Sequence, residues 1–193
     1  DSVRVDQDLN ISIPAQMLFD KGHRRIAVFG HVPGSSLFRL RLEAYRRFVG
    51  ENGLRNYSEF QELSDSLDVG PVEKAEAIIS LWKSLGREAP TALIASDKLA
   101  LHLIREAKRS SVAIPRDLSL VGIDNVSACE YVDPPLSSMD EPFGEMCQIA
   151  VELLMKRSES LQRTSQFVQL APKLVERQSV RTLSRDAQTV SIG

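Results

Sequence analysis

Short apolar runs alternate with amphipathic segments along most of this chain. The segments RRIAVFG (24–30), TALIA (91–95) and LSLVGI (118–123) have the length and β-branched content of buried strands. The segments between them place apolar residues three and four positions apart, which is typical of a helix with one buried face. Repeated strand and helix units of this kind predict an α/β fold, a doubly wound, Rossmann-like parallel sheet with right-handed crossovers.

Helices are expected in five amphipathic segments, and several of them carry boundary signals. Gly22 is a plausible residue after the end of the first helix, Ser35 or Ser36 can cap the second, and Pro71 suits the first position of the third. Asp97 can cap the fourth helix. The predicted apolar stripes are Ile13, Met17 and Leu18; Phe38, Leu42, Tyr45 and Val49; Ala75, Ile78, Ile79 and Trp82; Ala100, Leu103, Ile104 and Ala107; and Phe143, Met146, Ala150 and Leu153.

The remaining segments carry weaker patterns. Residues 3–5 and 59–63 are candidates for short strands, and FVQLAPKLVER (167–177) predicts two strands broken at its proline. The proline-punctuated DPPLSSMDEP (133–142) is expected to be an extended crossover or hinge rather than a regular element. The tail SRDAQTVSIG (184–193) has little to fold around and is expected to be disordered.

Composition is that of an ordinary globular protein. Of 193 residues, 42% are apolar and 26% charged, and the formal net charge of −2 gives no support for nucleic-acid binding by this segment as a whole. No apolar run approaches the roughly 20 residues of a membrane span. The first ten residues lack the order of a signal peptide. Cys129 and Cys147 fit neither a disulfide framework nor a metal site, so free thiols in a reducing cytoplasm are expected.

Sequence motifs for catalysis or cofactor binding are missing. The chain contains no G-x-G-x-x-G, no G-x-x-x-x-G-K-[ST] and no G-x-S-x-G. Its histidines, His23, His31 and His102, lack the spacing of metal ligands. We therefore expect no catalytic residues, no cofactor and no metal, and the sequence does not predict an enzyme.

Polar residues follow two of the predicted strands. Ser96 and Asp97 come after TALIA, and Asp124 and Asn125 come after LSLVGI. Parallel strands that end in polar side chains form a ligand cleft at that edge of the sheet. Asp124 could accept hydrogen bonds from ligand hydroxyls or could simply stabilise a turn. Ser96 and Asp97 carry the same ambiguity between a ligand contact and a helix cap.

Arg41 lies in an early turn of the helix that follows the loop HVPGSS. Helical side chains lean toward the N-terminus, so Arg41 could reach the cleft at the strand ends. The alternative is a solvated or salt-bridged arginine.

Several segments together resemble a known family. KGHRRIAVFG, SSLFRLRLEAYRRF, PTALIASDKLALHLIREA, IPRDLSLVGIDN, YVDPPLSSMDEP and LAPKLVERQS occur in the order found in the effector-binding core of bacterial LacI/GalR-type transcription repressors. That core is itself similar to periplasmic sugar-binding proteins. The resemblance covers most of residues 3–180 and implies two lobes joined by crossing strands, with a sugar or similar small ligand between them.

The resemblance also marks candidate ligand-binding positions. Arg41, in RLEAY, matches the family arginine that contacts the effector, and Asp124, in GID, matches the aspartate that bonds ligand hydroxyls. Ser96 falls where many members carry an asparagine. Ser35 and Leu37 are further pocket-facing candidates that do not define one compound.

The resemblance implies a homodimer as well, with Leu101 and Tyr131 at positions that such repressors place at their interface. It also implies operator DNA as a partner through an N-terminal domain that is not in this chain. The chain would consist of the end of the N-terminal lobe and a crossover helix (1–22), the C-terminal lobe (23–136), a hinge and a helix returning to the N-terminal lobe (137–160), the final strands (161–180) and a tail (181–193).

The leading hypothesis is therefore the effector-sensing and dimerisation domain of a cytoplasmic bacterial transcription regulator, with a sugar as its effector. A solute-binding receptor of a sugar transporter is the alternative, which a signal peptide upstream of Asp1 would favour and a helix-turn-helix upstream would exclude. A sugar-modifying α/β enzyme is a third possibility, but it needs a positioned acid–base pair or nucleophile, and the sequence offers none.

Overall fold

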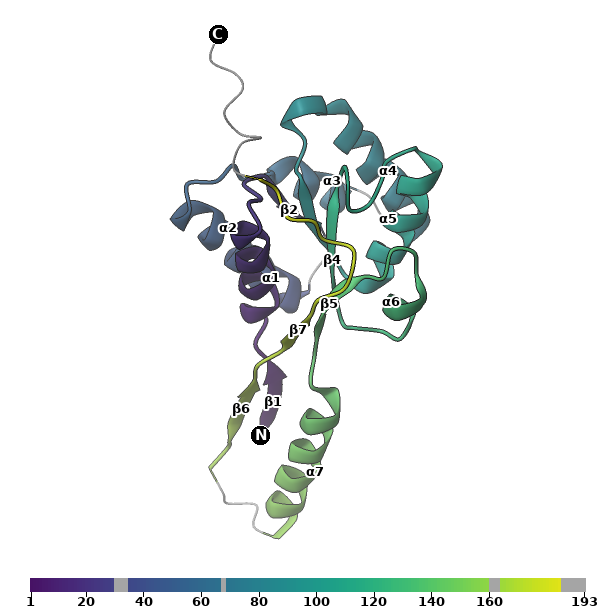
Figure 1. Ribbon diagram of the computed structural model, residues 1–193. Helices are drawn as coiled ribbons and strands as arrows, with labels where there is room; N and C mark the ends of the chain where they lie inside the picture. Colours follow the sequence, from purple (N-terminus) through teal and green to yellow (C-terminus); the bar gives the residue numbers. More distant parts are fainter. Residues whose placement is uncertain (30–34, 67–68, 160–163, 185–193) are drawn as a thin grey trace.

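The computed structural model describes residues 1–29, 35–66, 69–159 and 164–184 (Figure 1). The strands are β1 (Ser2–Val5), β2 (Ile26–Val28), β3 (Ala92–Ile94), β4 (Ser119–Ile123), β5 (Ser137–Asp140), β6 (Phe167–Leu170) and β7 (Lys173–Val175). The α-helices are α1 (Leu9–Asp20), α2 (Ser36–Glu51), α3 (Ser58–Ser66), α4 (Pro71–Ser84), α5 (Asp97–Arg109), α6 (Ala128–Tyr131) and α7 (Phe143–Glu159).

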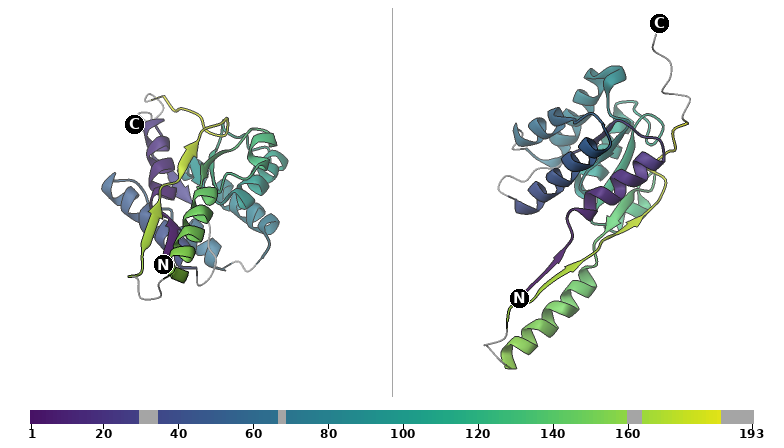
Figure 2. Two further views of the ribbon diagram at one scale, coloured as in Figure 1. Left: turned by 90° about the horizontal axis from the view of Figure 1, so that it is seen from below. Right: turned by 90° about the vertical axis from the view of Figure 1, so that its left-hand side faces the viewer.

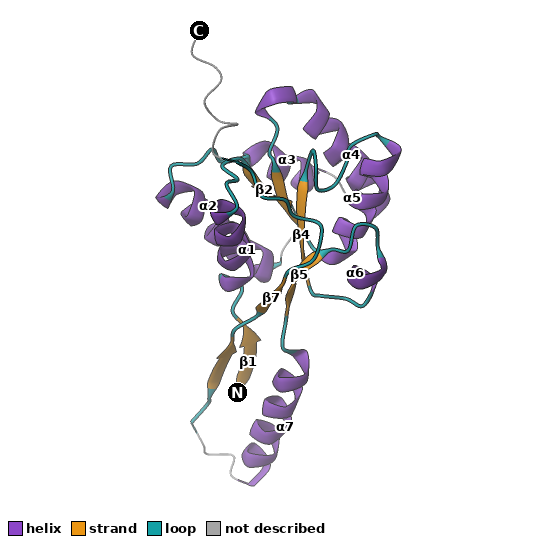
Figure 3. Ribbon diagram, in the orientation of Figure 1, coloured by secondary structure: helices purple, strands orange, loops and turns teal. Residues whose placement is uncertain are grey.

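The main sheet has five strands in the order β2-β3-β4-β5-β7 (Figure 3). Strands β2 to β5 pair in parallel, and β7 closes the sheet by pairing antiparallel to β5. The first strand, β1, belongs to a separate two-stranded parallel sheet with β6. The predicted α/β fold with a parallel sheet is confirmed. The two predicted strands around the proline near the end exist, but they belong to different sheets.

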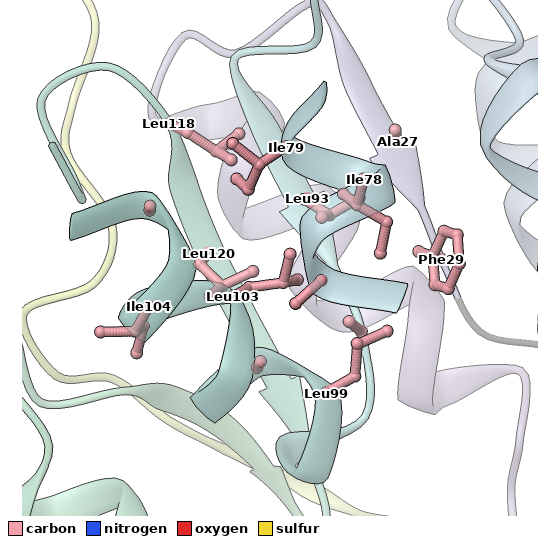
Figure 4. Packing of buried hydrophobic residues seen from close by; sticks show 14 of the residues in the cluster. Ala27, Phe29, Ile78, Ile79, Leu93, Leu99, Leu103, Ile104, Leu118 and Leu120 are labelled. Carbon is pink, nitrogen blue, oxygen red and sulfur yellow. The ribbon is translucent and has the colours of Figure 1, made fainter. Parts of the chain in front are cut away.

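Helices cover both faces of the main sheet. Alternate residues of each strand point to opposite sides, and apolar residues on both sides need cover. In β4, Leu120 packs with α3, α4, α5 and α6, whereas Val121 and Ile123 pack with α1 and α2. Figure 4 shows the first of these layers, in which Ile78 and Leu103 lie over Leu93 and Leu120. Burial on both faces explains why the parallel strands read as continuous apolar runs.

The predicted helix boundaries agree with the backbone hydrogen bonds. Gly22 has a φ of 91° after α1, and the N–H of His23 donates to the carbonyl of Leu18 at 3.0 Å, as in a Schellman ending. Ser35 is the N-cap of α2, where its Oγ accepts from the N–H of Phe38 at 3.4 Å. Pro71 is the first residue of α4. These local signals work because each satisfies or removes a backbone group that the helix itself leaves unpaired.

The strand predicted at residues 59–63 is wrong, because this segment lies within α3. Tyr57 and Phe60 are fully buried against the same core cluster, three positions apart, which is a helical spacing. Glu, Gln and Leu, which make up most of the segment, are also good helix formers.

The prediction of an irregular crossover for residues 133–142 is wrong for Ser137–Asp140, which form β5. Pro134 and Pro135 precede the strand and Pro142 follows it, so none of them removes a ladder hydrogen bond. Strand β5 lies between β4 and β7, and its small residues Ser137 and Ser138 are buried there. Only the short segment after Asp140 remains as a link to α7.

The β1–β6 pair and α7 project from one end of the main sheet (Figure 2). Three short segments link this projection to the rest of the molecule: residues 6–8, 141–142 and 171–172. Of the predicted stripe on α7, Leu153 is buried, whereas Phe143 and Ala150 are exposed. Within the described ranges, every helix is too short or too polar to cross a lipid bilayer. Beyond Ser184, the predicted tail lies outside the described residues.

Candidate functional site

A cavity of about 390 Å³ opens where β2, β3 and β4 end. The final residues of these strands, Val28, Ile94 and Ile123, all line it. Its other walls come from the N-terminal parts of α1, α2, α4 and α5. The carboxyl edge of a parallel sheet is where ligands bind in open α/β folds, because the loops and helix N-termini there leave a crevice. Polar side chains at the cavity are contributed by Ser35, Arg41, Lys74, Ser96 and Lys98.

Four of the five residues predicted to bind a ligand line this cavity. Ser35, Leu37 and Arg41 come from the start of α2, and Ser96 comes from the start of α5. Asp124 is not among the lining residues, but it follows Ile123 directly at the end of β4. The fold thus brings together positions that are distant in the sequence.

Asp124 occupies a sharp turn with a φ of 115°, and its N–H donates to the carbonyl of Met139 at 2.9 Å. Burial raises the pKa of its carboxyl to about 6, the nearby Arg41 guanidinium lowers it, and the charges of Glu141 and Asp97 raise it. Among the described residues, none donates a hydrogen bond to this carboxylate. Asp124 therefore stabilises a turn, as one interpretation of the sequence held. Among the described residues its carboxylate oxygens also remain available to accept hydrogen bonds from a ligand, as the other interpretation required.

The prediction that Asp97 caps α5 is wrong. Ser96 takes the N-cap position without a side-chain bond to the helix, and Asp97 is the first helical residue. The Asp97 carboxylate is fully buried, and it accepts from Ser138 Oγ at 2.6 Å, from the N–H of Val126 at 2.8 Å and from Cys129 Sγ at 3.2 Å. It therefore joins the loop after β4 to β5. The loop that it fixes is the one that carries Asp124.

Gly122 in β4 makes room for this buried carboxylate. A Cβ atom built on Gly122 would overlap the Asp97 carboxylate, so any other residue would displace it. Burial and the neighbouring carboxylate raise the pKa of the Cys129 thiol to about 12, which keeps it a neutral hydrogen-bond donor at pH 7.

Asn125, the second polar residue after β4, contacts other residues than Asp124 does. It adopts a φ of 50°, its Nδ2 donates to Asp140 Oδ1 at 3.1 Å, and its Oδ1 accepts from Arg177 Nη2 at 2.9 Å. The two residues of the GIDN corner thus have separate roles. Asp124 lies beside Arg41 and the cavity, and Asn125 ties β4 to the end of β5.

Arg41 both faces the cleft and forms a salt bridge, so the structure agrees with both interpretations of its position in the sequence. It lines the cavity, and its Nη2 also forms an ion pair with Glu141 Oε1 at 3.1 Å. Its Nε donates to Gln7 Oε1 at 2.6 Å. No local sequence pattern pointed to Gln7 or Glu141, because they lie 34 and 100 residues from Arg41 along the chain.

The two predicted interface residues lie on α5 and α6, and neither lines the cavity. Leu101 on α5 is partly buried against the core cluster. Tyr131 ends α6 and is 84% exposed.

His23 is part of the core rather than of a site. It is fully buried, its Nε2 lies 3.0 Å from the carbonyl of Arg181, and its Nδ1 lies 2.8 Å from Thr91 Oγ1. Burial lowers its pKa to about 4, so the ring is neutral and donates from Nε2, since a carbonyl only accepts. Across the described residues, no three His, Cys, Asp or Glu side chains are placed to hold a metal ion.

Comparison with known proteins agrees with this geometry. Over 173 residues the chain is 27% identical to the HTH-type transcriptional repressor PurR of Photobacterium profundum, a match covering 89% of this chain and 50% of that protein. It is 26% identical over 179 residues to the ribose operon repressor of Escherichia coli, covering 93% and 53% respectively. The chain spans about half the length of these relatives. They confirm the resemblance to LacI/GalR-type regulators.

A solved structure and a family model extend the comparison. A regulatory protein of the LacI family from Chloroflexus aggregans is 26% identical and superposes with a TM-score of 0.81, covering 92% of this chain and 63% of that one. Residues 15–180 match the model of the periplasmic binding protein-like domain. The chain therefore belongs to the periplasmic binding protein-like domain family.

Proposed function

We propose that this chain is the effector-binding part of a bacterial transcription regulator and that a sugar-like small molecule binds in the cavity at the ends of β2, β3 and β4. One observation carries the proposal. Arg41 lines a cavity of about 390 Å³ with apolar walls, and Asp124 follows the cavity-lining Ile123 directly, near enough for the Arg41 charge to lower the pKa of its carboxyl. Small-molecule sites commonly combine such walls with a few polar groups that fix the ligand's orientation.

The proposed contacts suit a polyhydroxylated ligand. The Asp124 carboxylate accepts hydrogen bonds from hydroxyls, and Arg41 donates to hydroxyl oxygens. Ser35 and Ser96 can do either, while Leu37 adds to the apolar wall that faces the C–H groups of a sugar. The relative named the ribose operon repressor supports a sugar as the ligand class.

In the intact protein, effector binding is proposed to shift the balance between two lobe arrangements and so to change DNA affinity. Operator DNA would be bound by a domain outside this chain, as the description of one relative as an HTH-type repressor suggests. Leu101 and Tyr131 are the proposed interface residues of a homodimer. A protein that acts on operator DNA works in the cytoplasm, and we propose that it carries out no catalysis.

The alternative of a transporter's solute-binding receptor shares the fold and the cavity. The matched relatives are transcriptional regulators, which favours the regulator.

Thermal-shift measurements on the full-length protein with a panel of sugars and nucleobases test the proposal. A ligand present at about 100 times its Kd stabilises the native state by roughly 2.7 kcal/mol, which raises Tm measurably. We expect at least one sugar to raise Tm in the wild type and not in Asp124→Ala. Asp20→Ala, which removes an exposed carboxylate on α1, serves as the matched control and keeps the full shift. No shift with any compound, or equal shifts in both variants, contradicts the proposal.

A further inference from the structure

Arg41 belongs to a closed ring of four side chains, Arg41, Gln7, Asn10 and Glu141, called here the Arg41 ring. Arg41 Nε donates to Gln7 Oε1 at 2.6 Å, and Arg41 Nη2 donates to Glu141 Oε1 at 3.1 Å. Asn10 Nδ2 completes the ring by donating to Glu141 Oε1 at 2.6 Å and to Gln7 Oε1 at 3.2 Å. Each acceptor oxygen in the ring thus holds two donors.

The ring is shielded from water. Asn10 is fully buried, Gln7 is also buried, and the side chains of Glu141 and Arg41 are 8% and 17% exposed. Hydrogen bonds that involve charged groups are shorter and stronger than neutral ones, and a low local dielectric strengthens them further. The guanidinium of Arg41 is therefore held in one orientation, in contrast to the exposed Arg46 on the same helix.

Two ring members lie in segments that link the projection to the main sheet, and a third lies just after one of them. Gln7 lies between β1 and α1, Asn10 is in the first turn of α1, and Glu141 follows β5 (Figure 1). Two of the three linking segments are thus bonded to one residue of α2. Asp8, in the first of these segments, also forms an ion pair with Arg47 of α2.

We propose that Gln7, Asn10 and Glu141 are positioning residues that orient Arg41 toward the cavity and bind it to both linking segments. This inference rests on the proposed function, in which the cavity takes a ligand. An arginine side chain has five N–H donors, and among the described residues Arg41 uses only Nε and one N–H of Nη2, while it also lines the cavity. A ligand that accepts a hydrogen bond from Arg41 then shares the guanidinium with Glu141. Occupancy of the cavity therefore changes the strength of the bonds between Arg41 and the linking segments. By thermodynamic reciprocity, the arrangement of these segments changes the affinity for the ligand.

Hydrogen exchange of the Arg41 Nε–H, measured by NMR on the ligand-free full-length protein, tests the positioning role. The resonance is assigned by its loss in Arg41→Lys. We expect it to exchange roughly tenfold more slowly than the Nε–H of Arg46 in the wild type. Gln7→Ala and Glu141→Ala abolish the difference, whereas Glu141→Gln, which keeps an acceptor, restores part of it. Equal exchange rates for the two arginines in the wild type overturn the proposal.

The pKa of Asp124 provides a readout that a purely structural role would not move. The charged groups that face its carboxyl are Arg41 from α2, Glu141 after β5 and Asp97 from α5. Removing the charge of Glu141 in Glu141→Gln lowers the pKa of Asp124 from about 6 toward its ordinary value, as measured by carboxyl ¹³C titration. An unchanged pKa contradicts the placement of Glu141 beside the site.

Backbone hydrogen exchange measured by mass spectrometry tests the connection to the linking segments. In Arg41→Ala, we expect exchange roughly tenfold faster over residues 6–10 and 139–143, with the α4–α5 core unchanged as evidence that the variant folds. Arg46→Ala is the control and leaves both segments as in the wild type. Wild-type exchange in Arg41→Ala overturns the proposal. Because no ligand is present, this failure is separate from a failure of the proposed function, which the thermal-shift panel detects.

Discussion

The main sheet with its helices and the projection formed by β1, β6 and α7 use their apolar residues in different ways. In the first region, residues such as Leu103 and Leu120 are fully buried between layers. In the projection, Val151, Leu154 and Met155 on α7 are exposed, the second of them by 69%. A similar content of apolar residues therefore yields a core in one region and an uncovered surface in the other. Among the described residues, the apolar side chains of the main sheet are covered from both faces, whereas those of α7 are left exposed.

Truncating one leucine in each region tests this difference in burial most directly. Leu103→Ala leaves a cavity in the core and should cost roughly 3 kcal/mol of unfolding free energy. Leu154→Ala, on the exposed face of α7, should change it by less than about 0.5 kcal/mol. Urea unfolding followed by circular dichroism measures both. Similar losses for the two variants would show that the chain covers α7 as well as it covers α5.

The buried polar contacts of the main sheet should be next in size. Asp97→Ala leaves Ser138 Oγ and the N–H of Val126 without their acceptor and should cost roughly 2 kcal/mol. Asp20→Ala removes an exposed carboxylate and should cost less than about 0.5 kcal/mol. Urea midpoints of the two variants give the difference. Equal midpoints would contradict the role of Asp97 in holding the loop after β4.

The smallest expected effect is the pH dependence from Asp124. Its pKa of about 6 in the folded protein exceeds its ordinary value, so the folded state binds more protons between pH 4 and 6. Wild-type stability relative to Asp124→Asn is therefore highest below about pH 4 and is lost as the pH rises through 6, by roughly 1 kcal/mol after allowance for partial exposure. Urea unfolding of both proteins at pH 4 and 7 measures it. A relative stability that rises with pH would refute the raised pKa.

Much of the main sheet could be predicted because periodicity and capping are local signals. The runs before Gly30 and around Leu120, the ending at Gly22 and the cap at Ser35 all act within a few residues. The misses have a different cause. β5 depends on pairing with β4 and β7, and α3 depends on the core that Tyr57 and Phe60 meet.

The residues of the candidate site also fall into those that could be predicted from the sequence and those that could not. Asp124 could be predicted from a strand end, Arg41 from its place in an early helical turn, and both from the family resemblance, and the Arg41 charge acts on the Asp124 carboxyl. The partners of Asp97 and the other members of the Arg41 ring could not be found in the sequence, because the contacts join residues up to 131 positions apart. Hydrogen bonds of that separation exist only once the layers are assembled.

Isothermal titration calorimetry of the full-length protein, with the sugar that gives the largest thermal shift, measures whether Arg41 and Asp124 bind the effector in this cavity. We expect Arg41→Ala and Asp124→Ala each to weaken binding by roughly tenfold or more, since each removes a hydrogen bond to a charged group. Arg46→Ala, on the outer face of the same helix, should bind as the wild type does. Unchanged affinity in Arg41→Ala and Asp124→Ala would contradict the placement of the effector in this cavity.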